Sequence, residues 1–154
     1  DTRILLNILD VPNRNNERLD ILEKFSECIQ LDCSFIIPMA VVIETGNHIA
    51  QNGDGNIRRA IAERFIETLE QTFTGEAPFR IADWDTQEKI REWLHEFPAH
   101  AQRNKSPTKT GEGTSFGDLS IIKEFEKSCS KFSMSEIFIW SLDDDLKAYH
   151  QNQS

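Results

Sequence analysis

The chain has 154 residues, of which 38% are hydrophobic and 28% are charged, and its formal net charge is −9. These values are typical of a soluble globular protein, and no stretch has the length of a transmembrane helix or the pattern of a signal peptide. We therefore expect one domain over residues 1–154, no membrane association and a cytoplasmic location. The three cysteines are odd in number and lack metal-ligand spacing, which indicates reduced core thiols.

The excess of acidic residues argues against a protein that coats nucleic acid by bulk electrostatic attraction. It does not exclude a nuclease, because a divalent cation can invert the local field at a carboxylate site. An acidic surface also suits a basic protein partner.

Apolar residues at spacings of three and four predict six helices, at about residues 2–9, 19–29, 39–51, 57–69, 90–97 and 115–130. Short apolar runs predict strands at 34–37, 79–82 and 137–141. Residues 99–113, which contain a proline and two glycines, predict a loop, and the polar tail after Tyr149 is expected to fray. Strands that alternate with helices indicate an α/β fold with a mainly parallel sheet.

Three consecutive carboxylates, Asp143, Asp144 and Asp145, follow the apolar run 137–141. Such a run suits a strand buried on both faces, and in a parallel α/β sheet chemistry gathers just past the carboxyl ends of the strands. Two carboxylates about 4 Å apart repel by about 4 kcal/mol at an effective dielectric near 20. The segment therefore predicts a metal site, although Asp144 and Asp145 could instead begin a short helix.

Asp118 falls in the middle of an apolar stripe on its predicted helix, formed by Ile121, Ile122, Phe125 and Cys129. Since aspartate is seldom buried without a partner, we favour a site residue there over a first-turn carboxylate that interacts with the helix dipole.

Glu44 lies with Asn47 and His48 on the less apolar side of its helix, which is the pattern of a solvated face. Glu44 and His48 are four residues apart and could also form a metal-ligand pair. Asp1 precedes the first predicted helix and, taken alone, is a candidate N-cap.

Taken together, these acids resemble the set found in PIN domains, the metal-dependent ribonuclease fold common among toxins of bacterial toxin–antitoxin pairs. Residues 1–6 (DTRILL) resemble the family's opening motif, and Ile37-Pro38 before a helix with Glu44 resembles its second acidic position. The segments 115–118 (SFGD) and 141–146 (SLDDDL) resemble the third position and the family's Thr-x-Asp-x-Asp-Phe ending.

The resemblance implies a PIN-like three-layer α/β/α fold with a short central sheet. By the same resemblance, the four metal-site acids are Asp1, Glu44, Asp118 and Asp143, with Asp145 as an auxiliary acid and Ser141 as the hydroxyl residue that orients the site. Hard oxygen ligands without cysteine select Mg²⁺ or Mn²⁺. The implied reaction is attack of a metal-activated water on an RNA phosphodiester.

An acidic pocket needs a means to hold RNA, and the segment that precedes the Asp118 helix contains Arg103, Lys105 and Lys109. These cations could hold the RNA backbone near the metal, or they could belong to a solvated loop. The resemblance also implies a basic antitoxin protein as a partner. A homodimer is a further possible assembly.

Two departures from the family pattern bear on these expectations. Arg3 stands where the family has a small polar residue, and it could pair with a site carboxylate or bind phosphate. The family's first strand would precede Asp1, so either residues upstream belong to the fold or the sheet lacks an edge segment.

Three readings follow from the sequence. The first is an Mg²⁺- or Mn²⁺-dependent endoribonuclease, the toxin of a toxin–antitoxin pair. The second is a PIN-like binding or scaffold module without catalysis, which Arg3 and the missing first strand favour. The third is a metal-dependent phosphatase with Asp1 as the nucleophile. The order of the four acids, which resembles that of PIN domains, argues against this third reading.

Overall fold

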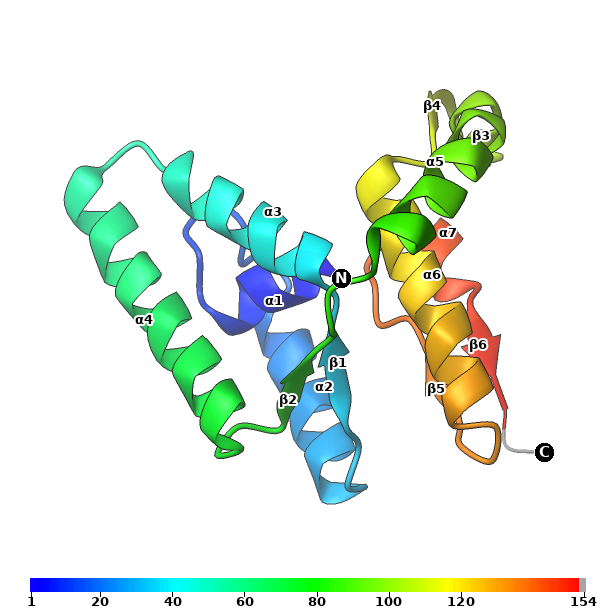
Figure 1. Ribbon diagram of the computed structural model, residues 1–154. Helices are drawn as coiled ribbons and strands as arrows, with labels where there is room; N and C mark the ends of the chain where they lie inside the picture. Colours follow the sequence, from blue (N-terminus) through cyan, green and yellow to red (C-terminus); the bar gives the residue numbers. More distant parts are fainter. Residues whose placement is uncertain (153–154) are drawn as a thin grey trace. The chain divides into compact units, whose positions relative to one another are not determined.

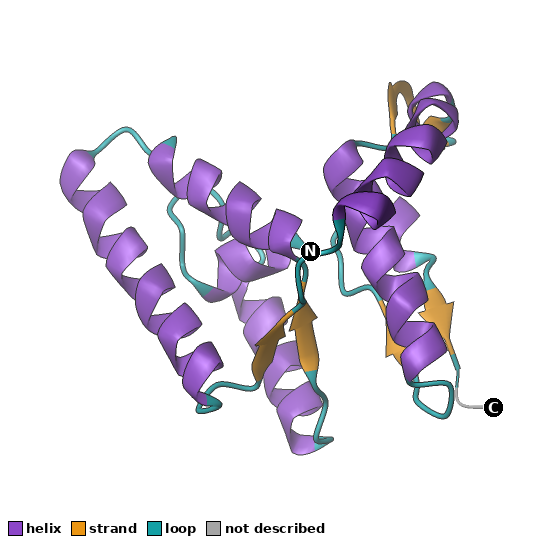
Figure 2. Cartoon of the chain, in the orientation of Figure 1, coloured by secondary structure: helices purple, strands orange, loops and turns teal. Residues whose placement is uncertain are grey.

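The structure is a computed structural model that describes residues 1–152. The chain divides into two compact units, which we call the N-terminal unit (Thr2–Ala82) and the C-terminal unit (Asp83–Ser154 together with Asp1). Helices and short strands alternate in both, so the prediction of an α/β chain is confirmed (Figures 1 and 2). Within residues 1–152, no helix is both long and apolar enough to cross a membrane.

The N-terminal unit contains four helices and one parallel strand pair. The helices are α1 (Thr2–Ile8), α2 (Arg18–Gln30), α3 (Met39–Ala50) and α4 (Gly55–Thr74), and the strands are β1 (Phe35–Ile37) and β2 (Phe79–Ile81). Strands β1 and β2 pair in parallel with Phe35 opposite Phe79. All six elements lie within a few residues of their predicted positions.

Apolar residues from α1 and its neighbours form the core of this unit. The α1 residues Ile4, Leu5 and Leu6 are buried, as are Val41 and Ile49 of α3. Phe25 of α2 contacts both strands, with its ring centroid 4.9 Å from that of Phe35 and 5.5 Å from that of Phe79. The apolar stripe of α1 therefore faces inward, as periodicity predicted. The prediction is wrong in part for α2 and α3, where Leu19 is 84% exposed and Ile43 is 50% exposed.

Helix α4 has sequence signals at both ends. The Asp54 side chain accepts hydrogen bonds from the backbone N–H groups of Asn56 and Ile57, which leaves fewer amides at the helix start without partners. At the other end Gly75 adopts a φ of 78°, which a residue without Cβ tolerates at low cost.

The C-terminal unit contains α5 (Gln87–Gln102), α6 (Phe116–Lys131) and a short α7 (Asp144–Lys147). A hairpin of β3 (Asn104–Ser106) and β4 (Lys109–Gly113) connects α5 to α6, and β5 (Ile137–Phe138) pairs with β6 (His150–Gln151). Both of these strand pairs are antiparallel. Parallel pairing among the described residues is thus confined to β1 and β2, which is less than the mainly parallel sheet we expected.

Three local expectations for this unit are wrong. The predicted strand 137–141 is not buried on both faces, because it pairs for two residues only and Phe138 is 42% exposed. The predicted loop 99–113 instead contains the end of α5, which continues past Pro98, and the β3–β4 hairpin. The tail does not fray directly after Tyr149, since His150 and Gln151 pair with β5; residues 153–154 lie outside the described part.

The β3–β4 hairpin is anchored at its base against α5. A Cβ atom at Gly113 would overlap the carbonyl oxygen of Ala101, so only glycine fits this close approach. The next backbone N–H, that of Thr114, donates to the carbonyl of His100 at 3.3 Å. These two contacts fix the position at which the hairpin leaves α5.

Candidate functional site

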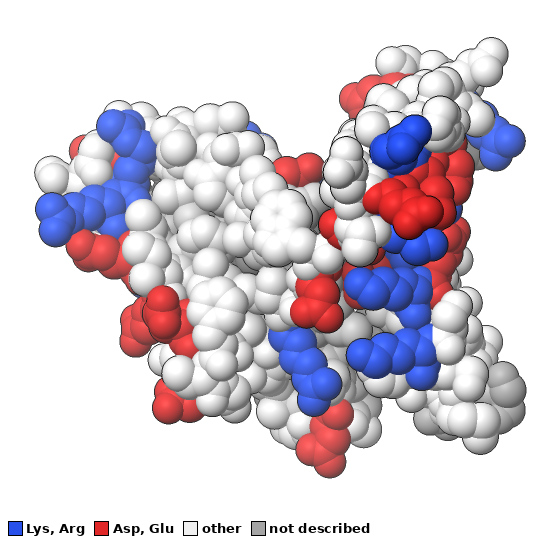
Figure 3. Space-filling model, viewed as in Figure 1, with Lys and Arg blue, Asp and Glu red and all other residues white. Residues whose placement is uncertain are grey.

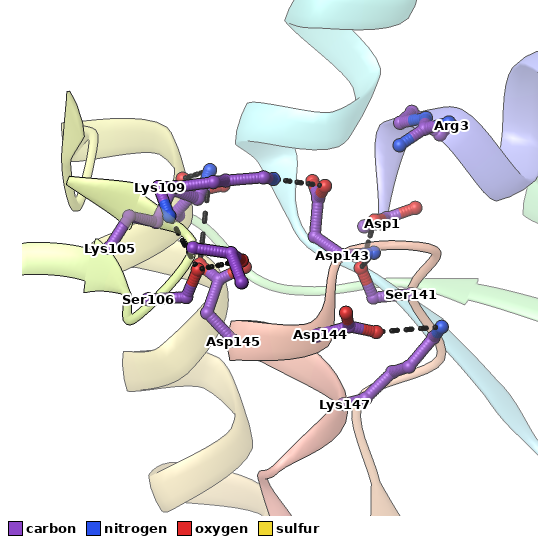
Figure 4. Close-up of polar contacts among 12 residues, drawn as sticks. Asp1, Arg3, Lys105, Ser106, Lys109, Ser141, Asp143, Asp144, Asp145 and Lys147 are labelled. Atoms are coloured by element: carbon purple, nitrogen blue, oxygen red, sulfur yellow. Dashed lines mark hydrogen bonds and ion pairs between the residues drawn. The ribbon is translucent and has the colours of Figure 1, made fainter. Parts of the chain in front are cut away.

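Carboxylates from three separate parts of the sequence form two groups of polar contacts in the C-terminal unit, which together we call the polar network (Figure 4). In one group Ser141 contacts Asp1 and Asp143, and Lys109 pairs with Asp143. In the other, Lys105 pairs with Asp118 at the start of α6 and with Asp145 of α7.

Asp1 and Asp143 are both held by Ser141, which is 3% exposed. The Ser141 hydroxyl donates to Asp1 Oδ2 and accepts from the backbone N–H of Asp143 at 2.9 Å. The backbone nitrogen of Asp1 also donates to the carbonyl of Trp140 at 2.8 Å. These bonds attach the first residue of the chain to the segment that follows β5.

Asp118 occupies the first turn of α6, where the Ser115 hydroxyl caps the helix by accepting from the Asp118 N–H at 3.0 Å. Its side chain is 16% exposed, so the position combines a helix-start carboxylate with the partial burial that the apolar stripe predicted. The buried neighbours Leu119, Ile121 and Ile122 fix the orientation of this helix.

Lys105 of β3 contacts two of the acids. Its Nζ lies 2.7 Å from Asp118 Oδ2 and 3.9 Å from Asp145 Oδ2, and its side chain is 11% exposed. Burial lowers the pKa of Lys105, but the hydrogen bond to Asp118 and attraction to the nearby carboxylates outweigh it, so the pKa is raised overall. The lysine is therefore charged at neutral pH.

Lys109, the first residue of β4, contacts Asp143. Its Nζ lies 2.8 Å from Asp143 Oδ1, and Figure 4 shows its side chain extended toward that carboxylate. The hydrogen bond to Asp143 raises the pKa of Lys109. At 40% exposure, the Lys109 side chain remains accessible to solvent and ligands.

Asp144 differs from its two neighbours. Its side chain is 89% exposed and pairs with Lys147 at 3.3 Å, one turn along α7. Asp145, in contrast, is 13% exposed, and its Oδ1 is buried with no hydrogen-bond partner among residues 1–152. Figure 4 shows Asp143 beside Lys109 and Asp144 beside Lys147, so neighbouring members of the triplet have different partners.

Three other residues singled out from the sequence belong to the N-terminal unit. Glu44 belongs to the N-terminal unit, where its Oε2 accepts a hydrogen bond from Thr2 Oγ1 at 2.5 Å. His48 contacts Gln51 Oε1 through Nδ1 at 3.2 Å. Arg3 forms an ion pair with Glu17 at 3.9 Å in the same unit.

Arg103, the third cation of the proposed RNA-binding segment, is exposed just after α5. Sequence reasoning found the lysines of this segment but missed their direct contact with the acids. A lysine thirteen residues before an aspartate carries no local signal of pairing, because the hairpin that brings them together depends on non-local contacts.

The donor chemistry of the network fits a hard divalent cation. The acids offer carboxylate oxygens without sulfur, and the buried, unpartnered Oδ1 of Asp145 is an acceptor available to a cation. The arrangement itself differs from a formed metal site: within residues 1–152, no three acidic, histidine or cysteine side chains are grouped to hold one ion. Two lysine ammonium groups contact the carboxylates instead.

No family model, curated protein or solved structure matches this chain. The interpretation of the site therefore depends on its residues and their geometry.

Proposed function

We propose that the protein is an Mg²⁺- or Mn²⁺-dependent endoribonuclease, with the toxin role of a PIN-like toxin–antitoxin pair as the corresponding biological function. The observation that carries this proposal is that Asp1, Asp118, Asp143 and Asp145 belong to two groups of polar contacts in the same unit, each of which contains a lysine. Glu44 is the further acid that the family pattern adds. The three-layer PIN-like arrangement is part of the same proposal.

In this proposal Asp118 and Asp143, with Asp145 beside them, hold the metal through carboxylate oxygens. When bound, a divalent ion lowers the pKa of a water molecule and offsets the charge that develops on the phosphate. Ser141 keeps Asp1 and Asp143 oriented, since its hydroxyl contacts both. No serine or histidine nucleophile is required.

Lys105 and Lys109 supply positive charge that can attract RNA to an otherwise acidic protein. On the face in Figure 3, basic and acidic side chains are interspersed over the C-terminal unit, so a local contact serves better than a broad basic surface. Lys109 is accessible and lies on a hairpin beside the acids. It can contact a backbone phosphate while the reacting phosphodiester lies at the carboxylates.

The test is RNA cleavage with Mg²⁺ or Mn²⁺ by the wild type, Asp118→Asn and Asp143→Asn, with Asp144→Asn as the matched control. We expect each of the first two substitutions to lower the rate at least 100-fold, which corresponds to about 2.7 kcal/mol. The control should keep wild-type activity, because the Asp144 side chain faces solvent. Equal activity in all four proteins would overturn the site assignment.

A second candidate is a binding module without catalysis. It is favoured by the ion pairs that already neutralise the carboxylates of Asp118 and Asp143, and by the absence of a grouped metal-ligand set in residues 1–152. No cleavage together with no metal binding by calorimetry would favour this candidate. Hydrolysis of a small phosphomonoester that requires Asp1 would instead favour the phosphatase reading.

A further inference from the structure

We propose that the β3–β4 hairpin is a built-in gate, in which Lys105 and Lys109 take the place of the divalent cation until metal and a phosphate ligand displace them. This inference depends on the proposed metal site and adds a regulatory element to it. It starts from the observation that both lysines of one short hairpin form ion pairs with the very acids assigned to the metal.

The lysine-paired state and the metal-bound state bring the same positive charge to the carboxylates. Two ammonium groups, from Lys105 and Lys109, bring two positive charges to the carboxylates of Asp118, Asp143 and Asp145. One Mg²⁺ or Mn²⁺ brings the same charge in a smaller volume. Exchange of lysines for metal therefore leaves the charge of the cluster unchanged, and each state relieves the repulsion between the acids.

The hairpin has a fixed base and an irregular ladder. Its base is held by the close approach of Gly113 to Ala101 and by the hydrogen bond from Thr114 to His100. Along β3 the register shifts between Asn104 and Ser106, so the ladder is irregular beside Lys105. An irregular ladder has fewer regular hydrogen bonds to break when the lysines move.

Space next to the hairpin would accept the displaced groups. A pocket of about 460 Å³ is lined by Lys105, Ser106 and Pro107 of the hairpin and its turn, and by Asp145 and Leu146 of α7. Lys105 itself lines this pocket, so there is space beside the carboxylates for a displaced ammonium group.

Displaced lysines remain close to the metal and become available to phosphate. A polyanion that binds the ammonium groups weakens their hold on the carboxylates, and a metal on the carboxylates frees the ammonium groups for the polyanion. The two ligands should therefore strengthen each other's binding, by the same factor in either order. In this way the gate would favour metal binding when the substrate is also bound.

The experiment measures Mn²⁺ binding by calorimetry to the full chain, without RNA, for the wild type, Lys105→Met and Lys109→Met. Methionine keeps an unbranched apolar stem and removes the competing charge. We expect each substitution to tighten Mn²⁺ binding about tenfold. Lys123→Met is the matched control, since Lys123 is 16% exposed and pairs with Glu96 at 2.6 Å away from these acids; its Mn²⁺ affinity should equal that of the wild type.

A second measurement follows the hairpin directly. Addition of Mn²⁺ to the wild type should increase backbone hydrogen exchange in residues 104–113 and leave the exchange of α6 unchanged. This readout needs no substitution. If Lys105→Met does not fold, Lys109→Met still tests the gate, because Lys109 is the more exposed of the two.

The possible results separate the gate from the metal site. Mn²⁺ binding by the wild type with equal or weaker affinity in both lysine variants would overturn the gate and leave the proposed nuclease intact. Absence of Mn²⁺ binding in the wild type and in every variant would overturn both. Tighter binding in the two lysine variants alone, with faster exchange in the hairpin, would support the gate.

Discussion

Lys105 Nζ lies 2.7 Å from Asp118 Oδ2, and both side chains are largely buried, at 11% and 16% exposure. The same ammonium group lies 3.9 Å from Asp145, so one cation connects the start of α6 with α7. Removal of one member of such a pair leaves a partly desolvated charge without its counter-ion, which is more costly than loss of a surface ion pair.

We therefore predict that Lys105→Met lowers the free energy of unfolding by about 2 kcal/mol, below the roughly 3–5 kcal/mol of a fully buried pair. Lys123→Met should cost less than about 1 kcal/mol, because its partners Glu96 and Glu126 are about half exposed. Urea denaturation measures both.

A double-mutant cycle of Lys105→Met with Asp118→Asn should give a coupling free energy of about 1–2 kcal/mol between the two residues. Additive effects would contradict the pairing.

The same lysine predicts a dependence of stability on alkaline pH. Its pKa is raised in the folded protein, so its contribution is fully present below the ordinary lysine pKa of about 10.4 and is lost as pH rises through the higher, folded value. The difference in unfolding free energy between wild type and Lys105→Met should be constant from pH 7 to about pH 9.5 and shrink above about pH 10.4. Urea titrations across this range test it, and a difference that grows above about pH 10.4 would contradict the raised pKa.

Ser141 supports a third prediction, because one buried hydroxyl serves two acids. Ser141→Ala removes the donor to Asp1 and the acceptor of the Asp143 N–H, and we expect a loss of about 1–3 kcal/mol in the free energy of unfolding. Ser120→Ala is the control: its hydroxyl donates to the Gly117 carbonyl within α6, a contact whose removal should change stability by less than about 0.5 kcal/mol.

Ser141→Thr, measured in the same experiment, distinguishes the effect of the hydroxyl group on stability from the effect of side-chain volume. Threonine keeps both hydrogen bonds, so this variant should be more stable than Ser141→Ala. If alanine and threonine are equally destabilising, packing at this position matters and the hydroxyl does not.

Much of the fold followed from local patterns. Stripes such as Ile4, Leu5 and Leu9 in and after α1 predicted helices because periodicity of 3.6 residues is a local property of the chain. Asp118 was identified by its place in an apolar stripe, and Asp144 and Asp145 were predicted as possible first residues of a short helix, which α7 confirms.

The tertiary structure decided the pairing of strands and the partners of the acids. Strands of two or three polar residues, such as β3 and β6, have too few positions to show alternation, so their existence depends on the strand beside them. Lys109 and Asp143 are 34 residues apart, and only the hairpin fold brings them within 2.8 Å. The sequence by itself determined which residues could form a carboxylate site; the folded chain decided that lysines lie against them, because electrostatic pairing depends on distance in space and not on distance along the chain.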